Sequence, residues 1–141
     1  MSRLSVDEKQ NLFRKAQEAL QKSYSKYSQI KVGAAILTRR NNIFLGCNVE
    51  NPSFGLTMCA EQVAIANAVI HEGGENLQVK AIMVVSEPKF PCSPCGACRQ
   101  LIFEFGNKAT VLFQGRENNI LELPIHKLLP FNFQLMPNIV K

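Results

Sequence analysis

Two cysteines three residues apart stand at a predicted helix start in the segment 93–98, which reads SPCGAC. Ser93 is a good N-cap, and Pro94 suits the first helical position because proline has no N–H to lose there. Cys95 and Cys98 would then share one face of the first turn, where the helix dipole favours thiolates. Two thiolates at a helix start suit zinc, although this spacing alone fits two buried cysteines equally well.

Cys59 supplies a third thiol immediately before a second predicted helix. The alanine-rich segment 63–70 that follows it indicates a buried helix. Three protein ligands leave zinc a fourth position for water, as in catalytic zinc sites. Glu61 is two residues from Cys59, close enough to reach that water and to move protons without binding the metal. The sequence therefore predicts an open zinc site shared by two helix starts.

A closed zinc site is the competing interpretation. Cys92, Cys95 and Cys98 are equally spaced, so Cys92 would be the fourth ligand beside Cys59. Four thiolates leave no water to activate, and such a site is structural rather than catalytic. The closed site gives Glu61 no role, so the open site is favoured. Cys92 is then expected to be a loop thiol of no special function.

Composition indicates a small cytosolic protein. The chain has 141 residues, enough for one domain spanning residues 1–141 with a real core. It begins without the apolar segment of a signal peptide, and its five cysteines suggest metal or free thiols rather than disulfides. The net charge of +5 raises nucleic acid as a partner, but the basic residues are scattered and favour a solvated surface. Cys47 is expected in a strand core, and His71 and His126 on the surface or in packing contacts.

Hydrophobic periodicity predicts alternating helices and strands. The capping-box pattern from Ser5 to Glu8 begins a first helix with one apolar face. The first two strands are joined by a short turn and are expected to form a hairpin. Together the elements predict a three-layer α/β/α fold with a mixed, about five-stranded sheet, in which both cysteine-bearing helices begin at one edge. The expected strands are residues 32–38, 43–49, 79–86, 109–113 and 120–123, and a short helix is expected at 124–129.

Five motifs together resemble the small homotetrameric zinc-dependent cytidine deaminases. In family order and with family-like spacing they are VGAA at 32–35, GCNVEN at 46–51, CAE at 59–61, SPCGACRQ at 93–100 and LLP at 128–130. The resemblance spans about residues 24–133, and the combination is highly specific although no single motif is. It implies a cytidine deaminase-like fold with one zinc ion per subunit. Cys59, Cys95 and Cys98 would hold this zinc, and Glu61 would be the proton shuttle.

The resemblance also implies substrate contacts. Asn48 and Glu50 match the family residues that hold the sugar hydroxyls, whereas their pattern alone favours a polar strand end in solvent. The backbone of Ala60 would contact the edge of the cytosine ring. Phe54 matches an aromatic loop position near the site. Phe133 matches an aromatic residue that reaches the base pocket of a neighbouring subunit.

Two positions depart from the family pattern. Ile30 stands where the family usually has Phe, so packing on the base would be weaker or reshaped. Gln62 stands where Arg usually follows the CAE motif. Three thiolates give a zinc site excess negative charge, which raises the pKa of bound water. The missing Arg would add to this effect unless a neighbour such as Arg99 compensates.

These implications amount to one expected activity. The protein would hydrolytically deaminate cytidine and 2′-deoxycytidine to uridine and 2′-deoxyuridine, releasing ammonia, through zinc-activated hydroxide in pyrimidine salvage. Its partners would be free nucleosides and further copies of itself in a cytoplasmic homotetramer with shared active sites, with no nucleic acid or membrane. The runner-up is a relative acting on another aminopyrimidine, such as a nucleoside antibiotic, or on cytosine in RNA or DNA. Asn48 and Glu50 favour the free nucleoside because they suit sugar hydroxyls.

Overall fold

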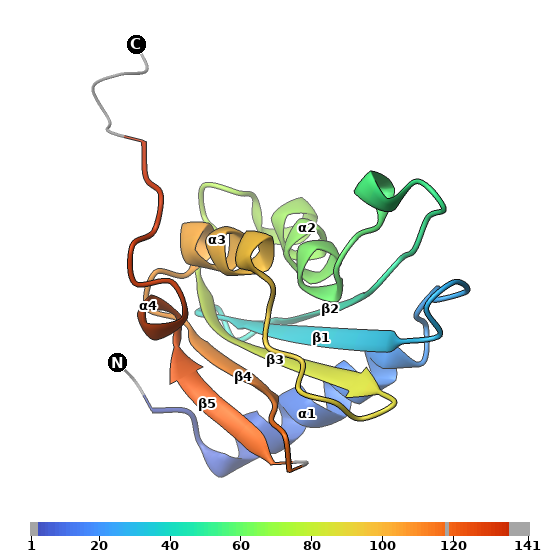
Figure 1. The fold of residues 1–141 in the computed structure, drawn as a ribbon. Coiled ribbons are helices and arrows are strands. Elements are labelled where there is room, and N and C mark those ends of the chain that lie inside the picture. The colour runs from blue at the N-terminus through green and yellow to red at the C-terminus, as the bar shows by residue number, and fades with distance from the viewer. Residues whose placement is uncertain (1–2, 118, 136–141) are drawn as a thin grey trace.

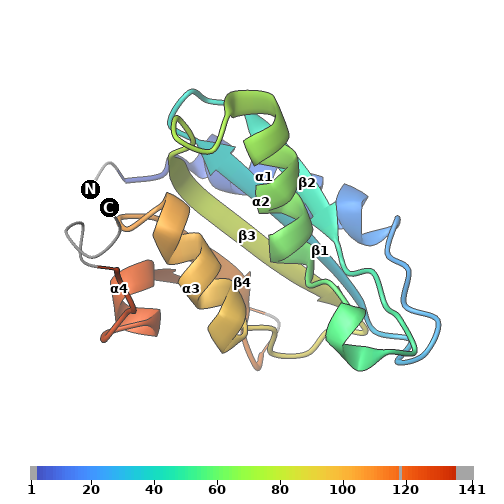
Figure 2. The same cartoon turned by 90° about the horizontal axis from the view of Figure 1, so that it is seen from above.

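The computed structural model describes residues 3–117 and 119–135 of the chain, arranged as three layers (Figure 1). The helices are α1 Val6–Leu20, α2 Ala60–Glu72, α3 Gly96–Phe105 and α4 Ile125–Leu128, with a 3₁₀ turn η1 at Phe54–Leu56. The strands are β1 Lys31–Thr38, β2 Ile43–Cys47, β3 Val79–Glu87, β4 Thr110–Gln114 and β5 Ile120–Pro124. α1 covers one face of the sheet, and α2 and α3 cover the other (Figures 1 and 2).

The sheet is mixed, as predicted. Its strand order is β2-β1-β3-β4-β5. β3 and β4 are parallel, and the other neighbouring pairs are antiparallel. β2 and β3 run in the same direction because both are antiparallel to β1. The chain passes from β2 to α2 and from β3 to α3. Both cysteine-bearing helices therefore begin beyond the carboxyl ends of these two strands, where such folds place ligands (Figure 2).

Successive residues of the central strands point to opposite faces of the sheet. On β3, Ile82 and Val84 belong to the core beneath α2 and α3, whereas Met83 and Val85 belong to the core beneath α1. All four side chains are almost completely buried. Burial on both faces explains why this strand is apolar without alternation.

α1 begins at the predicted capping box. Ser5 Oγ accepts a hydrogen bond from Glu8 N at 3.1 Å, and Glu8 Oε2 accepts one from Ser5 N at 2.8 Å. Lys80 of β3 also donates to the Glu8 carboxylate, which ties the start of the helix to the sheet. The buried residues of α1 recur at helical spacing on one face: Leu12, Ala16, Ala19 and Leu20.

Two glycines allow helices to lie directly on the backbone of the sheet. A Cβ at Gly46 on β2 would stand 2.2 Å from the Ala60 carbonyl oxygen of α2. A Cβ at Gly33 on β1 would stand 2.1 Å from the Ala16 carbonyl oxygen of α1. Neither position has room for a methyl group, so the two helices sit at a depth that only glycine permits.

The structure corrects three details of the sequence prediction. α3 begins at Gly96 with Cys95 as its N-cap, two residues later than the predicted N-cap Ser93. Ile70 was expected in a buried helical segment but is 81% exposed, because it lies on the side of α2 that faces away from the core. The second strand ends at Cys47, which is half-buried, rather than at residue 49.

The two histidines lie where they were expected. His71 is exposed at the end of α2, where its ring nitrogen lies 2.8 Å from the Asn67 carbonyl and its ring packs at 5.3 Å from that of Phe44. His126 is exposed on α4. Within the described ranges, none of the helices has the length and hydrophobicity that a bilayer-spanning segment needs.

Candidate metal centre and active site

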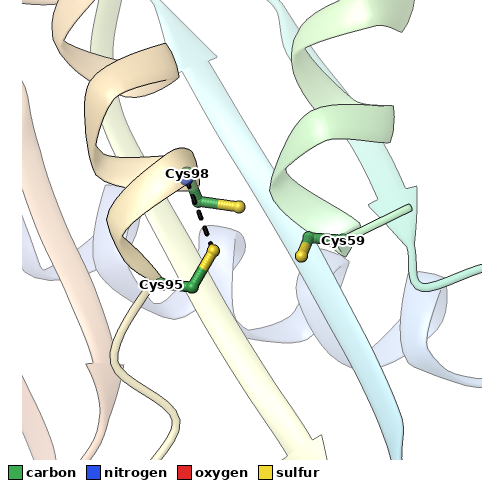
Figure 3. Close-up of side chains that lie close together, drawn as sticks. All are labelled: Cys59, Cys95 and Cys98. Atoms are coloured by element: carbon green, nitrogen blue, oxygen red, sulfur yellow. Dashed lines mark hydrogen bonds between the residues drawn. The ribbon is translucent and has the colours of Figure 1, made fainter. Parts of the chain in front are cut away.

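The starts of α2 and α3 bring three cysteines together (Figure 3). The Sγ atoms of Cys59, Cys95 and Cys98 all lie within 4.8 Å of one another. Cys59 is the N-cap of α2, Cys95 is the N-cap of α3, and Cys98 is the third residue of α3. The Cys98 N–H donates to Cys95 Sγ at 3.4 Å, so this sulfur caps the helix as a serine oxygen would. The predicted grouping of the three cysteines is confirmed.

This set of donors fits zinc. A tetrahedral zinc ion with Zn–S bonds of about 2.3 Å needs sulfurs about 3.8 Å apart, which the cluster reaches by small side-chain adjustments. The cysteines stand at two helix N-termini, each of which adds roughly half a positive charge that favours thiolates. Cys98 is buried and Cys95 is exposed, so the cluster is accessible from one side. Three ligands leave the fourth tetrahedral position that a catalytic zinc site keeps open.

Hydrogen bonding among the thiols determines which of them ionises first. The Cys98 thiol donates to Cys59 and lowers the pKa of Cys59 from 9.0 to about 7. The same contact, together with burial, raises the pKa of Cys98. Cys59 is therefore the first of this pair to become a thiolate, and metal binding at neutral pH displaces the proton of Cys98.

Cys92 lies outside this cluster. Its thiol donates to the Val84 carbonyl at 3.6 Å and lies 3.9 Å from Gln114 Oε1. Its side chain belongs to the core beneath α2 and α3, and burial raises its pKa. The closed four-cysteine site is therefore wrong. Cys92 lies in the loop between β3 and α3, as expected, with its thiol packed against β3 and β4, and its lack of a special function stays a prediction.

Glu61 is the second residue of α2 and is 5% exposed. Burial raises the pKa of its carboxyl group, and the hydrogen bond from its own N–H together with the nearby Cys98 side chain opposes part of that rise. A raised carboxyl pKa approaches the range in which the group can both accept and release protons near neutral pH. Glu61 thus lies beside the sulfurs without being one of the clustered ligands.

Two adjoining pockets open at this edge of the molecule. The first has a volume of about 280 Å³ and is lined by residues that include Cys59, Ala60 and Glu61. The second has a volume of about 270 Å³ and is lined by residues that include Glu50. Thr57 lines both, so the pockets are neighbours. Their combined size is in the range of sites that bind small organic ligands.

Asn48 lines the first pocket and is also hydrogen-bonded to the segments around it. Its Oδ1 accepts hydrogen bonds from Ser23 Oγ and, at 2.8 Å, from Val32 N. Its Nδ2 donates to the Ile30 carbonyl at 2.8 Å. Asn48 therefore joins the segment before β1 to the start of that strand, and one amide hydrogen remains for a ligand.

Glu50 organises the same segment from the second pocket. Its Oε2 accepts from Tyr27 N at 2.8 Å and from Ser28 N at 3.2 Å, and its Oε1 accepts from Ser28 Oγ. These hydrogen bonds lower the pKa of the Glu50 carboxyl group, with Ser28 Oγ as the largest cause. The carboxylate therefore stays ionised and keeps lone pairs for a further hydroxyl donor.

Two of the apolar positions predicted around the substrate, Phe54 and Ile30, differ in location. Phe54 is the first residue of η1, is 87% exposed and lines the second pocket, in agreement with its expected place near the site. Ile30 is 36% exposed and is not among the residues that line either pocket. What Ile30 contributes here is its carbonyl group, which fixes Asn48.

Gln62 and Arg99 are both engaged in holding the cysteine-bearing segments. Gln62 Oε1 accepts from Cys59 N at 2.9 Å and so caps the start of α2. The Arg99 guanidinium donates to Pro94 O at 2.8 Å, to Ser93 Oγ at 2.8 Å and to the Leu128 carbonyl at 3.1 Å. Arg99 therefore fixes the segment that precedes Cys95.

Phe133 lies in the segment after α4, which runs beside α3. The Gln100 side chain donates to the Phe133 carbonyl at 2.9 Å and accepts from Phe133 N at 3.2 Å. One amide group thereby holds the backbone of this segment, while the Phe133 side chain is mostly exposed. Gln100 ends the SPCGACRQ motif, but the sequence gives no sign of this contact, because Phe133 is 33 residues away along the chain.

Residues 6–114 match the family described as the cytidine and deoxycytidylate deaminase zinc-binding region. The chain belongs to this family. The cytidine deaminase of Halalkalibacterium halodurans is 39% identical over 127 residues, which cover 89% of this chain and 94% of that protein. As a member of the cytidine and deoxycytidylate deaminase family the chain uses zinc, and Cys59, Cys95 and Cys98 are the side chains grouped to bind it.

Solved cytidine deaminase structures share the fold. The crystal structure of cytidine deaminase from Burkholderia pseudomallei superimposes with a TM-score of 0.77 at 39% identity, covering 88% of this chain and 98% of that one. The enzyme from Mycobacterium tuberculosis gives a TM-score of 0.78 at 34% identity, with coverages of 93% and 100%. The predicted α/β fold with a five-stranded sheet is confirmed.

Proposed function

We propose that this protein hydrolytically deaminates cytidine and 2′-deoxycytidine to uridine and 2′-deoxyuridine, with release of ammonia. The observation that carries the proposal is a buried carboxyl group, Glu61, which lines one pocket together with Cys59 and Cys95, two of the three convergent cysteines. Membership of the cytidine and deoxycytidylate deaminase family supports the same reaction.

In this proposal Glu61 moves every proton. Zinc held by the three cysteines would supply a Lewis acid that makes a water molecule nucleophilic at neutral pH. Glu61 accepts a proton from that water as the water oxygen attacks C4 of the cytosine ring. Glu61 then gives the proton to N3 of the ring. It next carries the remaining hydroxyl proton to the amino group, which leaves as ammonia. One nucleoside and one water are consumed, and one uracil nucleoside and one ammonia are formed.

The charge of the pockets supports a free nucleoside rather than a nucleotide. Among the residues that line the two pockets none is Lys or Arg, whereas Glu50 and Glu61 are acidic. A phosphate group would meet negative charge without a cation to pair with it. The ring would lie in the first pocket beside the backbone of Ala60. The sugar would lie in the second pocket, with its hydroxyls donating to Glu50 and accepting the free amide hydrogen of Asn48.

We also infer a homotetramer in which active sites are shared between subunits. Large apolar side chains are exposed on η1 and on the segment after α4, among them Phe54, Phe131 and Phe133. Such exposure at a binding site supports burial against further copies of the chain. The resemblance of Phe133 to the family residue that reaches a neighbouring base pocket supports the same arrangement. We propose that this assembly acts in pyrimidine salvage in the cytoplasm. The five cysteines all lie within the described ranges and form no disulfide, which supports a reducing compartment.

The decisive experiment measures zinc content and uridine formation on one purified sample. Wild-type protein should carry about one zinc per chain and convert cytidine to uridine. Glu61→Gln should keep its zinc and lose at least about 10²-fold in kcat, because the amide cannot carry the proton. Cys92→Ala is the matched control outside the cluster and should keep both zinc and activity. A fully zinc-loaded wild type that leaves cytidine unchanged would refute the proposal.

Substrate comparison separates this proposal from its runner-up. Cytidine and 2′-deoxycytidine should be turned over far faster than cytosine, CMP, a cytidine-containing oligonucleotide or an aminopyrimidine nucleoside antibiotic. A preference for any of the last three would replace the proposed substrate. Cytosine tests the sugar contacts, since loss of the ribose removes every hydrogen bond assigned to Glu50 and Asn48.

The role of Gln62 is testable through pH. Gln62 brings no charge to the site, so we propose that Gln62→Arg lowers the pH at which activity appears, by stabilising the anionic form of the site. Arg99 would compensate through its positive charge, since each of its three guanidinium nitrogens already donates a hydrogen bond to Ser93, Pro94 or Leu128. A pH–rate profile that does not move in Gln62→Arg would mean that the helix N-termini already supply the charge that is needed.

A further inference from the structure

The pocket beside the cysteines has one aromatic residue among those that line it, Phe90. Ile30, the position from which packing on the base was expected, is not one of these lining residues. The apolar wall of the pocket therefore comes from a different segment, the loop between β3 and α3.

Phe90 is held in place from both sides of this loop. It is half-buried and packs against the core beneath α2 and α3. Ser86 Oγ donates to the Phe90 carbonyl at 3.3 Å, and Ser86 N donates to Gln114 Oε1 at 2.6 Å. The Gln114 carbonyl accepts from Cys92 N at 3.1 Å. Gln114 of β4 thus pins the chain before and after Phe90, so little ordering is required when a ligand binds.

The same pocket contains the groups that would meet the reacting part of a cytosine ring. Cys59, Ala60 and Glu61 line it together with Phe90. Its volume of about 280 Å³ is small, so a ring whose C4 approaches the sulfur cluster lies in contact with the pocket walls. Pyrimidine rings pack favourably on aromatic side chains, in stacked or edge-on arrangements.

We propose that Phe90 is the residue on which the cytosine ring packs, and that it supplies the contact expected from Ile30. The inference rests on the proposed function, because it assumes a cytosine nucleoside in this pocket. It makes Phe90 a specificity-determining residue that acts on binding and leaves proton transfer by Glu61 unaffected.

Kinetics of matched variants test the inference. Phe90→Leu should raise KM for cytidine about tenfold, with kcat changed by less than about threefold, because the lost contact is made equally in the bound and the reacting states. Phe90→Tyr keeps an aromatic ring and should stay within about threefold of the wild-type KM. Phe13→Leu, a variant in α1 on the opposite face of the sheet, should leave KM unchanged. All three should retain zinc.

Two results would overturn the inference. One is an unchanged KM in zinc-loaded Phe90→Leu. The other is loss of zinc in both Phe90→Leu and Phe90→Tyr, since Phe90 would then act by holding the loop that leads to Cys95.

A spectroscopic test is independent of turnover. The chain contains no tryptophan, so Phe90→Trp introduces a single tryptophan. Uridine, which is not turned over, should change the tryptophan emission of Phe90→Trp, and the change should saturate as the uridine concentration rises. The emission of Phe13→Trp should not change. An emission that ignores uridine, while uridine inhibits the same variant, would contradict packing on Phe90. Failure of the wild type to deaminate cytidine is a separate result, which counts against the proposed function rather than against the position of Phe90 in the pocket.

Discussion

Gly46→Ala tests how far the metal centre depends on the depth at which α2 lies on the sheet. The added Cβ would stand 2.2 Å from the Ala60 carbonyl oxygen and 2.3 Å from Ala64 N, both backbone atoms of α2. Ordinary contacts begin at 3.4 Å, so the difference from 2.2 Å requires α2 to retreat by about 1.2 Å. Overpacking of this kind costs about 1–3 kcal/mol of unfolding free energy, which lowers Tm by roughly 3–10 °C in a domain of this size.

The same displacement should weaken zinc binding. α2 carries Cys59 at its start, and metal sites tolerate changes of only about 0.2 Å in ligand distance. We therefore expect the zinc affinity of Gly46→Ala to fall at least about tenfold. Competition against a colorimetric chelator measures the affinity, and thermal denaturation of the same samples measures the stability.

Gly33→Ala is the matched control on the other face of the sheet. Its Cβ would stand 2.1 Å from the Ala16 carbonyl oxygen of α1, a helix that carries none of the clustered cysteines. Stability should fall by a similar amount, while zinc affinity stays within about twofold of the wild type. The reasoning is refuted if Gly46→Ala loses stability but binds zinc normally, or if Gly33→Ala weakens zinc binding to the same extent.

Three further outcomes are expected. The pKa of Glu8 is lowered chiefly by the Lys80 hydrogen bond, so the contribution of Glu8 to the free energy of unfolding is present above pH 4.5 and disappears as the pH falls through the lowered pKa. Glu8→Ala should therefore lower the free energy of unfolding by about 1 kcal/mol in denaturant titrations at pH 7. A loss of stability that does not shrink in acid would contradict this. In zinc-free protein, Cys59 should react with iodoacetamide with a pH midpoint near 7 and be protected by zinc, whereas a midpoint near 9.0 would show that the Cys98 contact is absent. Gln100→Leu removes both hydrogen bonds to the Phe133 backbone, so chymotrypsin should cleave there roughly tenfold faster, and an unchanged rate would show that other contacts hold this segment.

Local signals in the sequence predicted most of the architecture. The capping box at Ser5 and Glu8 depends on residues three apart, and it begins α1 as expected. The apolar run of β3 is equally local, because burial on both faces leaves its mark on every residue. The start of α3 was predicted two residues early, since Ser93 and Cys95 are both competent N-caps. The choice between them involves Arg99, which holds Ser93 through a network that extends to Leu128, and such distant contacts are not visible in a local pattern.

In the candidate site too, local patterns in the sequence predicted some residues, and distant contacts hid others. The spacing of Cys95 and Cys98 and their place at a helix start were sufficient to predict a metal site with Cys59. The position of Cys92 was not predictable, because equal spacing along the chain says nothing about β3 and β4, which surround its thiol. The contribution of Phe90 was missed for the same reason, since its place in the pocket depends on hydrogen bonds across two strands.

The N-cap positions of Cys59 and Cys95 have a consequence for the life of the protein in the cell. A zinc ion between them joins two helices whose starts are 36 positions apart in the sequence, and it does so only in the folded chain. Free zinc therefore favours the folded chain by mass action, as any ligand of the native state does. Under zinc starvation a larger fraction of the protein would be open to proteases, so metal supply would regulate how much of it the cell keeps as well as how fast each copy works.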